Sequence, residues 1–401
     1  MTRKQVSDRY VLDEQIMMNE GKSREPSCAS EAAKPPVADP GVESAIEKGL
    51  GWLCHAQDFS TSADCGIASH FYLGRGWTTS YPETTGYIAP TLLRQARIAG
   101  ADGRRKRVRR MLDWLVSIQY ESGAFQGGRI GTVPVVPVTF NTGQILIGLA
   151  AGVEEWRSRY LQPMRRAADW LVATQDPDGG WSTYPSALTV QGAKTYEIQT
   201  AWGLLEAARI DPGRPYGEAA LANIDWALGL QNENGWFEAC DLREFERPLT
   251  HTTGYALRGV LEGYRFCQEA KYLRAAQGTA DALIEIMDDE GFIPGRLDRW
   301  WRASVDSACL TGTAQIACCW FMLYDFTGDL RYRDAAYLAT RYVRRTMKLD
   351  GSPGVRGGIA GSWPIDGDYM PNSMLSWACK FVVDANLMEA ETRAEEARAG
   401  T

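Results

Sequence analysis

The chain has 401 residues, of which 45% are apolar and 10% aromatic, so it is long enough to bury a large hydrophobic core. Its formal net charge is −7 with acidic and basic residues interspersed, which argues against a nucleic-acid partner. Nine cysteines without paired spacing and the lack of an apolar run of membrane length predict a reduced, cytoplasmic protein without stable membrane insertion.

The chain divides into three parts by composition. Residues 1–40 are rich in Ser, Pro, Glu and Lys, lack the apolar stretch of a secretory signal, and are expected to be disordered. Residues 41–391 carry a continuous repeat and are expected to form a single domain. Residues 392–401 are expected to form a charged C-terminal tail.

A helix end with a tryptophan five residues before a glutamine recurs along this domain, at intervals of roughly 57 residues that are typical of a stacked supersecondary unit. The clear copies are Trp52–Gln57, Trp114–Gln119, Trp170–Gln175 and Trp226–Gln231, and the weaker ones are Ala282–Met287 and Tyr342–Met347. A two-helix unit of this length cannot bury its own apolar face and must stack on its neighbours. Six copies therefore predict an all-α fold, an (α/α)6 toroid of six helical hairpins.

The two helices of each hairpin differ in pattern. The first helices are amphipathic, which predicts an outer ring, at 43–57, 105–119, 161–175, 217–231, 269–287 and 332–347. The second helices are apolar on nearly all sides, which predicts an enclosed inner ring, at 83–98, 140–152, 195–208, 251–266, 307–325 and 372–389. Long connections from outer to inner helices, such as 58–82 and 288–306, should cover one mouth of the ring, where binding groups concentrate.

A Thr-Gly pair marks the start of most inner helices and aligns the repeats. Three residues before its glycine stand Glu83, Phe140, His251 and Cys309 in different repeats. Glu83 and His251 are three repeats apart, so we expect them to face each other across the mouth as catalytic residues. A helix N-terminus favours an anion, so Glu83 is expected to be ionised and to act as base or nucleophile. The alternative is that both only cap their helices.

The fifth long connection adds acidic and aromatic candidates. Asp298 and Asp306 are predicted to be catalytic, because glycoside hydrolysis usually needs a pair of carboxylates and Glu83 could pair with either. Arg299, Trp300 and Trp301 are predicted to bind substrate, since rings stack on sugar faces and guanidinium groups hold carboxylates.

Elimination chemistry would instead use a histidine and a phenol, and His251 lies one turn from Tyr255 on the same helix face. The remaining predicted substrate-binding residues are Tyr81, Asn141, Tyr255, Arg356 and Tyr369. Three histidines without ligand spacing indicate no metal site, and no cofactor is expected.

The phrase from Arg165 to Gln175, followed by Gly180-Trp181, resembles the QW repeat of terpenoid cyclases and protein prenyltransferase β subunits. The resemblance implies a toroid. The DxDD acid motif and the DDxxD magnesium motif of terpenoid cyclases are absent, and Asp306 and Cys309 do not have the spacing of a prenyltransferase zinc site. A terpenoid cyclase or prenyltransferase-like enzyme lacking DxDD is therefore the second interpretation.

The inner-helix starts Ser80–Tyr87 and Leu249–Tyr255 resemble those of the six-hairpin glycosidase superfamily, and the whole pattern resembles toroid proteins associated with bacterial exopolysaccharide gene clusters. The resemblance implies a carbohydrate-active enzyme, a hydrolase, lyase or epimerase, that acts on an oligosaccharide or a polysaccharide-biosynthesis intermediate in the mouth of the toroid. A third possibility is a non-catalytic glycan-binding toroid. The sequence leaves the oligomeric state open.

Overall fold

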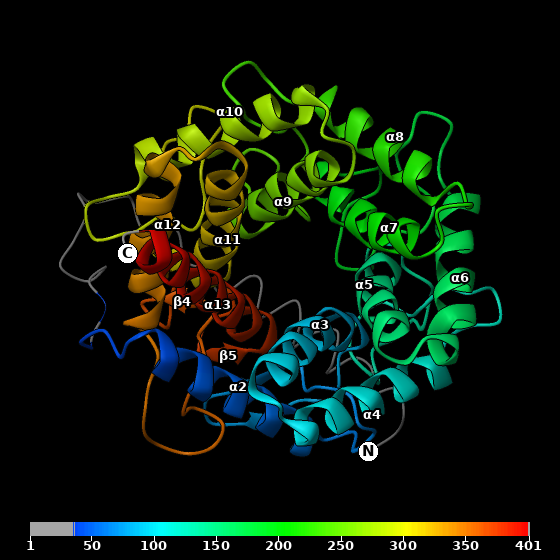
Figure 1. Cartoon of the computed structure of the whole chain (residues 1–401), viewed down its shortest axis with the longest axis horizontal. Coiled ribbons are helices and arrows are strands. Elements are labelled where there is room, and N and C mark those ends of the chain that lie inside the picture. Colours follow the sequence, from blue (N-terminus) through cyan, green and yellow to red (C-terminus); the bar gives the residue numbers. More distant parts are fainter. Residues whose placement is uncertain (1–34, 36, 400–401) are drawn as a thin grey trace.

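The computed structural model describes residue 35 and residues 37–399. The predicted disordered segment 1–40 falls almost entirely outside these residues. Within the described part, outer and inner helices alternate along the chain and close into a ring, with the inner helices around its axis (Figure 1). The last inner helix packs against the first outer and first inner helices, so the toroid is continuous. The predicted all-α toroid of six hairpins is confirmed.

The helix bounds follow the repeat. The outer helices are α2 (Val42–Asp58), α4 (Asp102–Ile118), α6 (Ser158–Ala173), α8 (Tyr216–Leu228), α10 (Ala270–Ile286) and α12 (Leu330–Arg344). The inner helices are α3 (Pro82–Ala99), α5 (Thr139–Trp156), α7 (Gln199–Ile210), α9 (Thr250–Cys267), α11 (Leu310–Thr327) and α13 (Ser376–Ala399), and a 3₁₀ turn, η2 (Thr195–Ile198), leads into α7.

Burial separates the two rings as the hydrophobic pattern predicted. On α11 every residue from Leu310 to Leu323 is buried, as expected of a helix enclosed on all sides. On α4 only one face is buried, and its charged residues lie on the solvent side. The apolar core therefore lies between the rings and within the inner ring.

The repeated Thr-Gly pair has a structural explanation. The Thr142 hydroxyl donates to the Val138 carbonyl at 2.8 Å and accepts from the Phe125 amide at 3.0 Å, which ties the mouth connection to the helix start. The glycine allows neighbouring inner helices to touch, because a Cβ at Gly143 would come within 2.8 Å of the Thr200 Cα. One pair thus sets both the loop position and the helix spacing.

The repeated glutamine links successive hairpins. The Gln175 side-chain amide donates to the Gly179 carbonyl at 2.9 Å in its own turn and to the Ala219 carbonyl at 2.8 Å in the next outer helix. Gln119 makes the equivalent bonds to Gly123 and Pro163. Both bonds satisfy carbonyl groups that would otherwise lack partners, so the glutamines have structural roles.

Short strands join the mouth connections. A three-stranded antiparallel sheet has the order β2 (Gly76–Trp77), β1 (His70–Tyr72), β5 (Ser373–Leu375), with Phe71 paired to Met374. A second pair joins β3 (Ala308–Cys309) to β4 (Ser362–Trp363). The first sheet links the first and last long connections, so the ring is closed at the mouth as well as between its helices.

The C-terminal end differs from the expectation of a separate charged tail. α13 continues to Ala399, and Thr392 is buried. Glu389 pairs with Arg393 at 2.8 Å, and Glu396 pairs with Arg333 of α12 at 2.7 Å. The charged residues therefore extend the helix against its neighbour. No helix in the described part of the chain has the length and hydropathy needed to cross a membrane.

Candidate functional site

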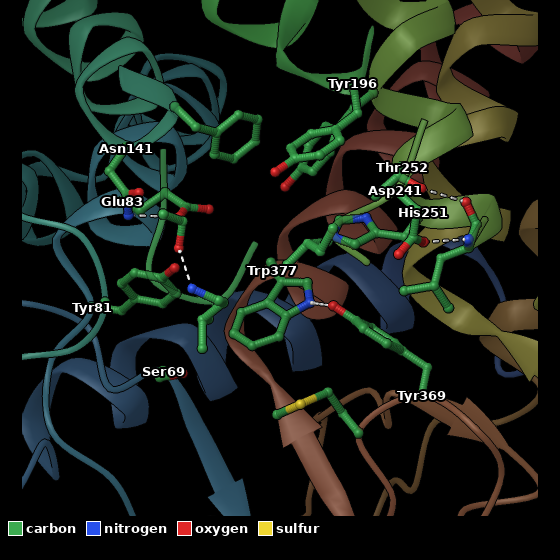
Figure 2. Close-up of a pocket in the computed structure, with 18 of the residues that line it drawn as sticks. Ser69, Tyr81, Glu83, Asn141, Tyr196, Asp241, His251, Thr252, Tyr369 and Trp377 are labelled. Carbon is green, nitrogen blue, oxygen red and sulfur yellow. Dashed lines mark hydrogen bonds between the residues drawn. The ribbon is translucent and has the colours of Figure 1, made fainter. Parts of the chain in front are cut away.

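A cavity of about 340 Å³ lies where the N-terminal ends of the inner helices converge, beneath the long connections (Figure 2). First-turn residues of α3, α5, α9 and α13 form part of its wall. The aromatic residues that line it are Tyr81, Tyr87, Phe140, Tyr196, Tyr255, Tyr369 and Trp377. A concave pocket that combines aromatic side chains with polar groups is a common form of a small-molecule site.

Glu83 lies in the first turn of α3, directly after Pro82, which starts the helix. Its side chain is buried, and its Oε2 accepts a hydrogen bond from Asn141 Nδ2 at 2.8 Å. Burial raises the pKa of this carboxyl to about 7, and a hydrogen bond from the side chain of Tyr81 opposes the shift. At neutral pH both protonation states of Glu83 are populated, so it can donate or accept a proton.

His251 lies in the first turn of α9 on the opposite wall, and Figure 2 shows Glu83 with Asn141 on one side of the pocket and His251 on the other. Its Nδ1 lies 2.7 Å from Gln315 Oε1 of α11. An amide oxygen only accepts, so Nδ1 carries the proton and the neutral ring keeps its lone pair on Nε2. Burial lowers the His251 pKa to about 4, partly opposed by the Gln315 bond, so the ring is a neutral base at pH 7.

Tyrosine side chains lie close to His251. The His251 ring lies 4.5 Å from the Tyr255 ring and 5.6 Å from the Tyr369 ring, measured between centroids. Tyr87 and Tyr255 share a hydrogen bond, and the Tyr369 hydroxyl accepts from Trp377 Nε1 at 3.1 Å. Burial raises the pKa of Tyr255 and Tyr369 well above the usual value, so both stay protonated and can donate hydrogen bonds.

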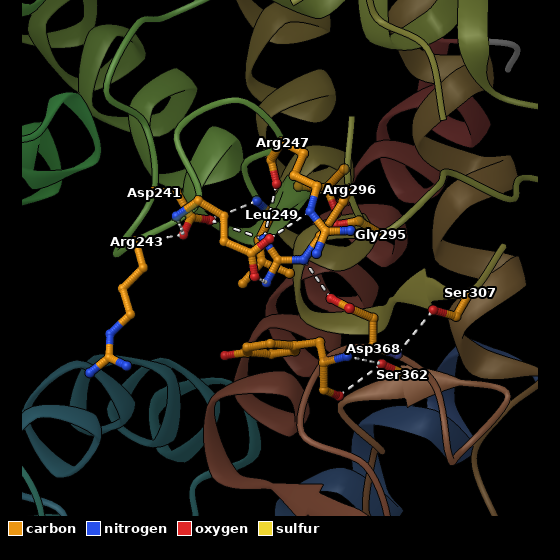
Figure 3. Close-up of polar contacts among 12 residues, drawn as sticks. Asp241, Arg243, Arg247, Leu249, Gly295, Arg296, Ser307, Ser362 and Asp368 are labelled. Carbon is orange, nitrogen blue, oxygen red and sulfur yellow. Dashed lines mark hydrogen bonds and ion pairs between the residues drawn. The ribbon is translucent and has the colours of Figure 1, made fainter. Parts of the chain in front are cut away.

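A network of charged side chains forms another part of the cavity wall. In it, Arg296 lies between Asp241 and Asp368 and pairs with both (Figure 3). Asp241 Oδ1 accepts the amides of Arg243 and Glu244 at 3.0 and 3.1 Å, and its Oδ2 accepts the Leu249 amide at 2.9 Å. Arg296 Nη1 lies 3.6 Å from the same Oδ2. Both oxygens of Asp241 therefore hold the connection in shape.

Sequence reasoning missed the lining residues Asp241 and Arg296. Both lie in connections without repeat phase, so no alignment of the hairpins marks them. The surrounding sequence, with an Asp followed closely by other charged residues, is typical of a solvated loop. Their burial appears only when the fourth, fifth and sixth connections pack together.

Six of the residues predicted from the sequence line the cavity together: Tyr81, Glu83, Asn141, His251, Tyr255 and Tyr369. Six others do not line it: Asp298, Arg299, Trp300, Trp301, Asp306 and Arg356. Asp306 and Arg356 are exposed. The expected pairing of Glu83 with Asp298 or Asp306 in the cavity is not formed, because the fifth connection reaches the cavity through Arg296 and then turns away.

No group of three or more His, Cys, Asp or Glu residues is arranged to hold a metal ion, as far as the described part of the chain extends. The arrangement that the cavity offers is instead a titratable carboxyl and a neutral imidazole on opposite walls, with phenols between them. That arrangement is suited to moving protons.

Comparison with solved structures identifies proteins of the same fold. An unsaturated glucuronyl hydrolase specific for heparin matches with a TM-score of 0.70 and 14% identity, over 89% of this chain and 99% of that chain. A sugar epimerase from a ruminal bacterium matches with a TM-score of 0.72 and 10% identity, over 88% and 98%. At such identity the likeness shows the fold alone.

Sequence relatives come from terpenoid biosynthesis. A squalene–hopene cyclase of Bradyrhizobium diazoefficiens is 27% identical over 216 residues, covering 49% of this chain and 30% of the relative. A drimenyl diphosphate synthase of Streptomyces showdoensis is 29% identical over 176 residues, covering 44% and 31%. The aligned region thus spans about a third of the length of either relative.

A family model described as the squalene-hopene cyclase C-terminal domain matches residues 41–241, half of the chain. The matched region runs from the start of the first outer helix to the wall residue Asp241, and includes the tryptophan–glutamine repeats in their clearest form. The resemblance to the α/α-toroid superfamily is confirmed, and the chain belongs to the squalene-hopene cyclase C-terminal domain family.

Proposed function

We propose that the protein is a carbohydrate-active enzyme that moves protons at a sugar carbon, as an epimerase or a lyase. The observation that carries the proposal is the placement of Glu83 and His251 on opposite walls of one cavity. Two proton-transfer groups on opposite faces of a substrate match a reaction in which one face loses a proton and the other receives one.

The protonation states fit this division of roles. His251 Nε2 takes the proton from a carbon next to a carbonyl or carboxyl group, and the electron pair of the broken C–H bond stays with the substrate. In an epimerase, the protonated Glu83 then returns a proton to that carbon from the other face. In a lyase, the Glu83 proton goes to the departing glycosidic oxygen as the C–O bond breaks. Tyr255 and Tyr369 can donate hydrogen bonds to the oxygen on which charge develops.

A two-carboxylate hydrolase is supported less well. Such an enzyme needs a second carboxylate within about 5–10 Å of the first. Asp241 and Glu244 line the cavity, but the oxygens of Asp241 are occupied by three backbone amides and Arg296, and Glu244 pairs with Arg247 at 2.6 Å. Asp298 and Asp306 do not line the cavity. The names of the structural neighbours, a glucuronyl hydrolase and a sugar epimerase, are compatible with a sugar ligand and do not choose between reactions.

The second candidate is a terpenoid cyclase-like enzyme, which the family match and the aromatic lining favour. The acid strength of Glu83 argues against this candidate. Cyclisation started by protonating an alkene requires a strong acid, and burial makes Glu83 a weaker acid than an ordinary carboxyl. The DxDD acid motif and the DDxxD magnesium motif of such enzymes are also absent from the sequence.

The test is a thermal-shift screen followed by proton exchange. Purified protein is heated with acidic and neutral oligosaccharides, and separately with prenyl diphosphates with and without Mg²⁺, because a ligand of the native state raises Tm. Sugars that stabilise are then incubated with the enzyme in D₂O and analysed by NMR. Deuterium at one sugar carbon, or a new double bond, supports the proposal.

Three results would contradict it. Stabilisation only by prenyl diphosphate with Mg²⁺ would favour the terpenoid candidate. Sugar hydrolysis without carbon-bound deuterium would indicate a hydrolase. Sugar binding with no turnover, unchanged in Glu83→Gln, would indicate a non-catalytic glycan-binding toroid.

A further inference from the structure

Trp300 is displayed at the tip of the fifth connection, outside the cavity. Its side chain is 64% exposed, and it is the one large apolar side chain of residues 287–309 that the described structure leaves exposed. Single exposed apolar side chains are common on protein surfaces, so the argument for Trp300 rests on the groups that hold and flank its ring.

The turn that carries Trp300 is held by hydrogen bonds. Asp298 Oδ1 accepts the backbone amides of Trp300 and Arg302, both at 2.9 Å. The Asp298 amide donates to the Arg302 carbonyl, and the Trp301 amide donates to the Asp298 carbonyl, each at 2.9 Å. Trp301 has a φ of 62°, in the left-handed region, so these four bonds hold a backbone turn that the chain would not otherwise favour. The predicted catalytic Asp298 thus acts as the support of the turn.

The fourth connection anchors this turn. Trp301 Nε1 donates to the Asn234 carbonyl at 3.0 Å, and the Trp301 ring packs edge-on against Trp236 with centroids 5.3 Å apart. Asn234 Nδ2 donates in return to the Arg299 carbonyl at 2.9 Å. Trp301 is therefore the buried anchor, and Trp300, its neighbour, points to solvent from a fixed base.

Two guanidinium groups flank the exposed ring. The guanidinium carbons of Arg299 and Arg302 lie 5.9 and 5.6 Å from the centroid of the Trp300 ring. Arg299 is paired with Glu238 at 2.8 Å, whereas the guanidinium of Arg302 makes no ion pair with any described residue. The ring is thus bordered by hydrogen-bond donors rather than by other apolar side chains.

We propose that Trp300, with Arg302 beside it, is an accessory binding site for a glycan chain whose other end enters the cavity. A sugar ring needs a single aromatic face to stack on and donors at its edge to bind its hydroxyl or carboxylate groups. A protein partner would need a contiguous apolar patch around the tryptophan, which this loop does not have. The proposal rests on the proposed carbohydrate function and extends it to a polymeric substrate.

The position of Trp300 in the fifth connection suits such a substrate. Arg296 of the same connection lines the cavity, and four residues of extended chain span at most about 14 Å. Trp300 is thus attached to the cavity wall by a short segment, and the proposal places one sugar unit between Glu83 and His251 while a later unit of the same chain contacts Trp300.

The test compares long and short glycans on the full chain. Sodium alginate, hyaluronan and dextran are assayed by affinity electrophoresis and calorimetry, each beside its own disaccharide, with wild type, Trp300→Ala, Trp300→Tyr and Leu330→Ala. Leu330 is the matched control, an exposed apolar residue at the start of α12. We expect Trp300→Ala to weaken binding of one long glycan about five- to tenfold, consistent with the loss of one stacked ring. The affinity of Trp300→Ala for the disaccharide should stay close to that of wild type. The Trp300→Tyr and Leu330→Ala variants should bind the long glycan about as well as wild type does.

The outcomes separate this inference from the proposed function. If wild type binds a long glycan and Trp300→Ala binds it equally well, the accessory site is wrong while the cavity function stands. Equal weakening for the disaccharide and the polymer also overturns it, because Trp300 would then act on the cavity. If wild type binds no glycan of either length, the proposed function itself fails. Binding of a protein partner that needs Trp300, without glycan binding, contradicts both.

Discussion

Glu83 and His251 occupy the same position in the first and fourth repeats, but their neighbours tune them in opposite directions. Burial disfavours the charged form of each, so the carboxyl pKa rises and the imidazole pKa falls. Asn141 and Gln315 are the hydrogen-bond partners that orient them. Sequence alignment of the repeats predicted the two chemical groups and their opposition. It did not predict these partners, because each partner comes from a different hairpin.

At the residue scale, the first prediction concerns the pH profile. Activity needs neutral His251 and protonated Glu83, so kcat/KM should rise as pH increases through about 4 and fall as it passes about 7. Glu83→Gln keeps the shape of the side chain but cannot exchange a proton, and should lower kcat by about 10²–10⁴-fold. Steady-state kinetics across pH checks both. A high-pH limb that persists unchanged in the residual activity of Glu83→Gln would contradict the assignment.

The second prediction concerns Gln315, a positioning residue that acts through His251. Gln315→Leu removes the acceptor for Nδ1–H, so the ring is no longer held with Nε2 unprotonated, and kcat should fall by about tenfold or more while KM changes little. Gln315→Glu retains an acceptor and adds a charge that raises the His251 pKa, so the acid limb should move to higher pH. A profile that does not move would mean that Gln315 only packs.

The third prediction follows from linkage. The carboxyl of Glu83 has a pKa of about 7 when folded, against 4.5 for the ordinary group, so the folded state binds more protons between these values. Stability contributed by Glu83 therefore falls as pH rises through that window. Glu83→Gln should gain stability relative to wild type from pH 4 to pH 8, by roughly 3 kcal/mol at most. The opposite slope from His251 cancels in this difference. Denaturant unfolding of wild type and Glu83→Gln at pH 4 and pH 8 checks this prediction. If the difference in unfolding free energy between the two proteins does not change with pH, the Glu83 carboxyl is exposed to water in the folded state.

At the element scale, helix packing depends on glycines at the inner-ring crossings. A Cβ at Gly148 of α5 would lie 2.2 Å from the Gly86 carbonyl oxygen of α3, and one at Gly203 of α7 would lie 2.3 Å from that of Gly143. Backbone cannot yield as a flexible side chain does, so the helices would have to separate. The Thr-Gly repeat marked Gly86 and Gly143 as helix starts, but it did not indicate that Gly148 and Gly203 contact them.

The fourth prediction tests this contact. Gly148→Ala should destabilise the protein by about 1–3 kcal/mol, even though alanine favours helix more than glycine does. Gly51→Ala is the control, because a Cβ there meets nothing within 4 Å in the middle of α2. Chemical denaturation measures both. Stabilisation by Gly148→Ala, as propensity alone predicts, would show that the helices are not in contact at this point.

At the scale of the whole molecule, the ring is closed by contacts between its first and last parts. The buried Arg344 at the end of α12 pairs with Asp39, ahead of the first helix, at 2.8 Å, and also with Glu389 of α13. β1 and β5 make a second closure at the mouth. The cavity wall also spans the ring, since Arg296 joins the fourth and sixth connections.

The fifth prediction addresses this closure. Arg344→Met leaves Glu389 buried with only Arg393 as a partner, and should cost about 3–5 kcal/mol, because a buried charge loses its main counterion. The double variant Arg344→Met with Glu389→Leu should recover much of the loss. Thermal unfolding of the single and double variants checks the coupling. Full additivity of the two changes would mean that the pair does not contribute to closing the ring.

The sequence by itself determined the toroid, the division into outer and inner rings, and six of the residues that line the cavity, because hydrophobic period and repeat phase depend on neighbours along the chain. Only the tertiary structure decided which mouth residues meet. Asp298 and Asp306 had suitable chemistry, yet the backbone turn at Trp301 carries that part of the fifth connection away from the cavity and brings Arg296 to it instead. Loop conformation depends on contacts between connections that are far apart in sequence, and no periodic pattern records such contacts.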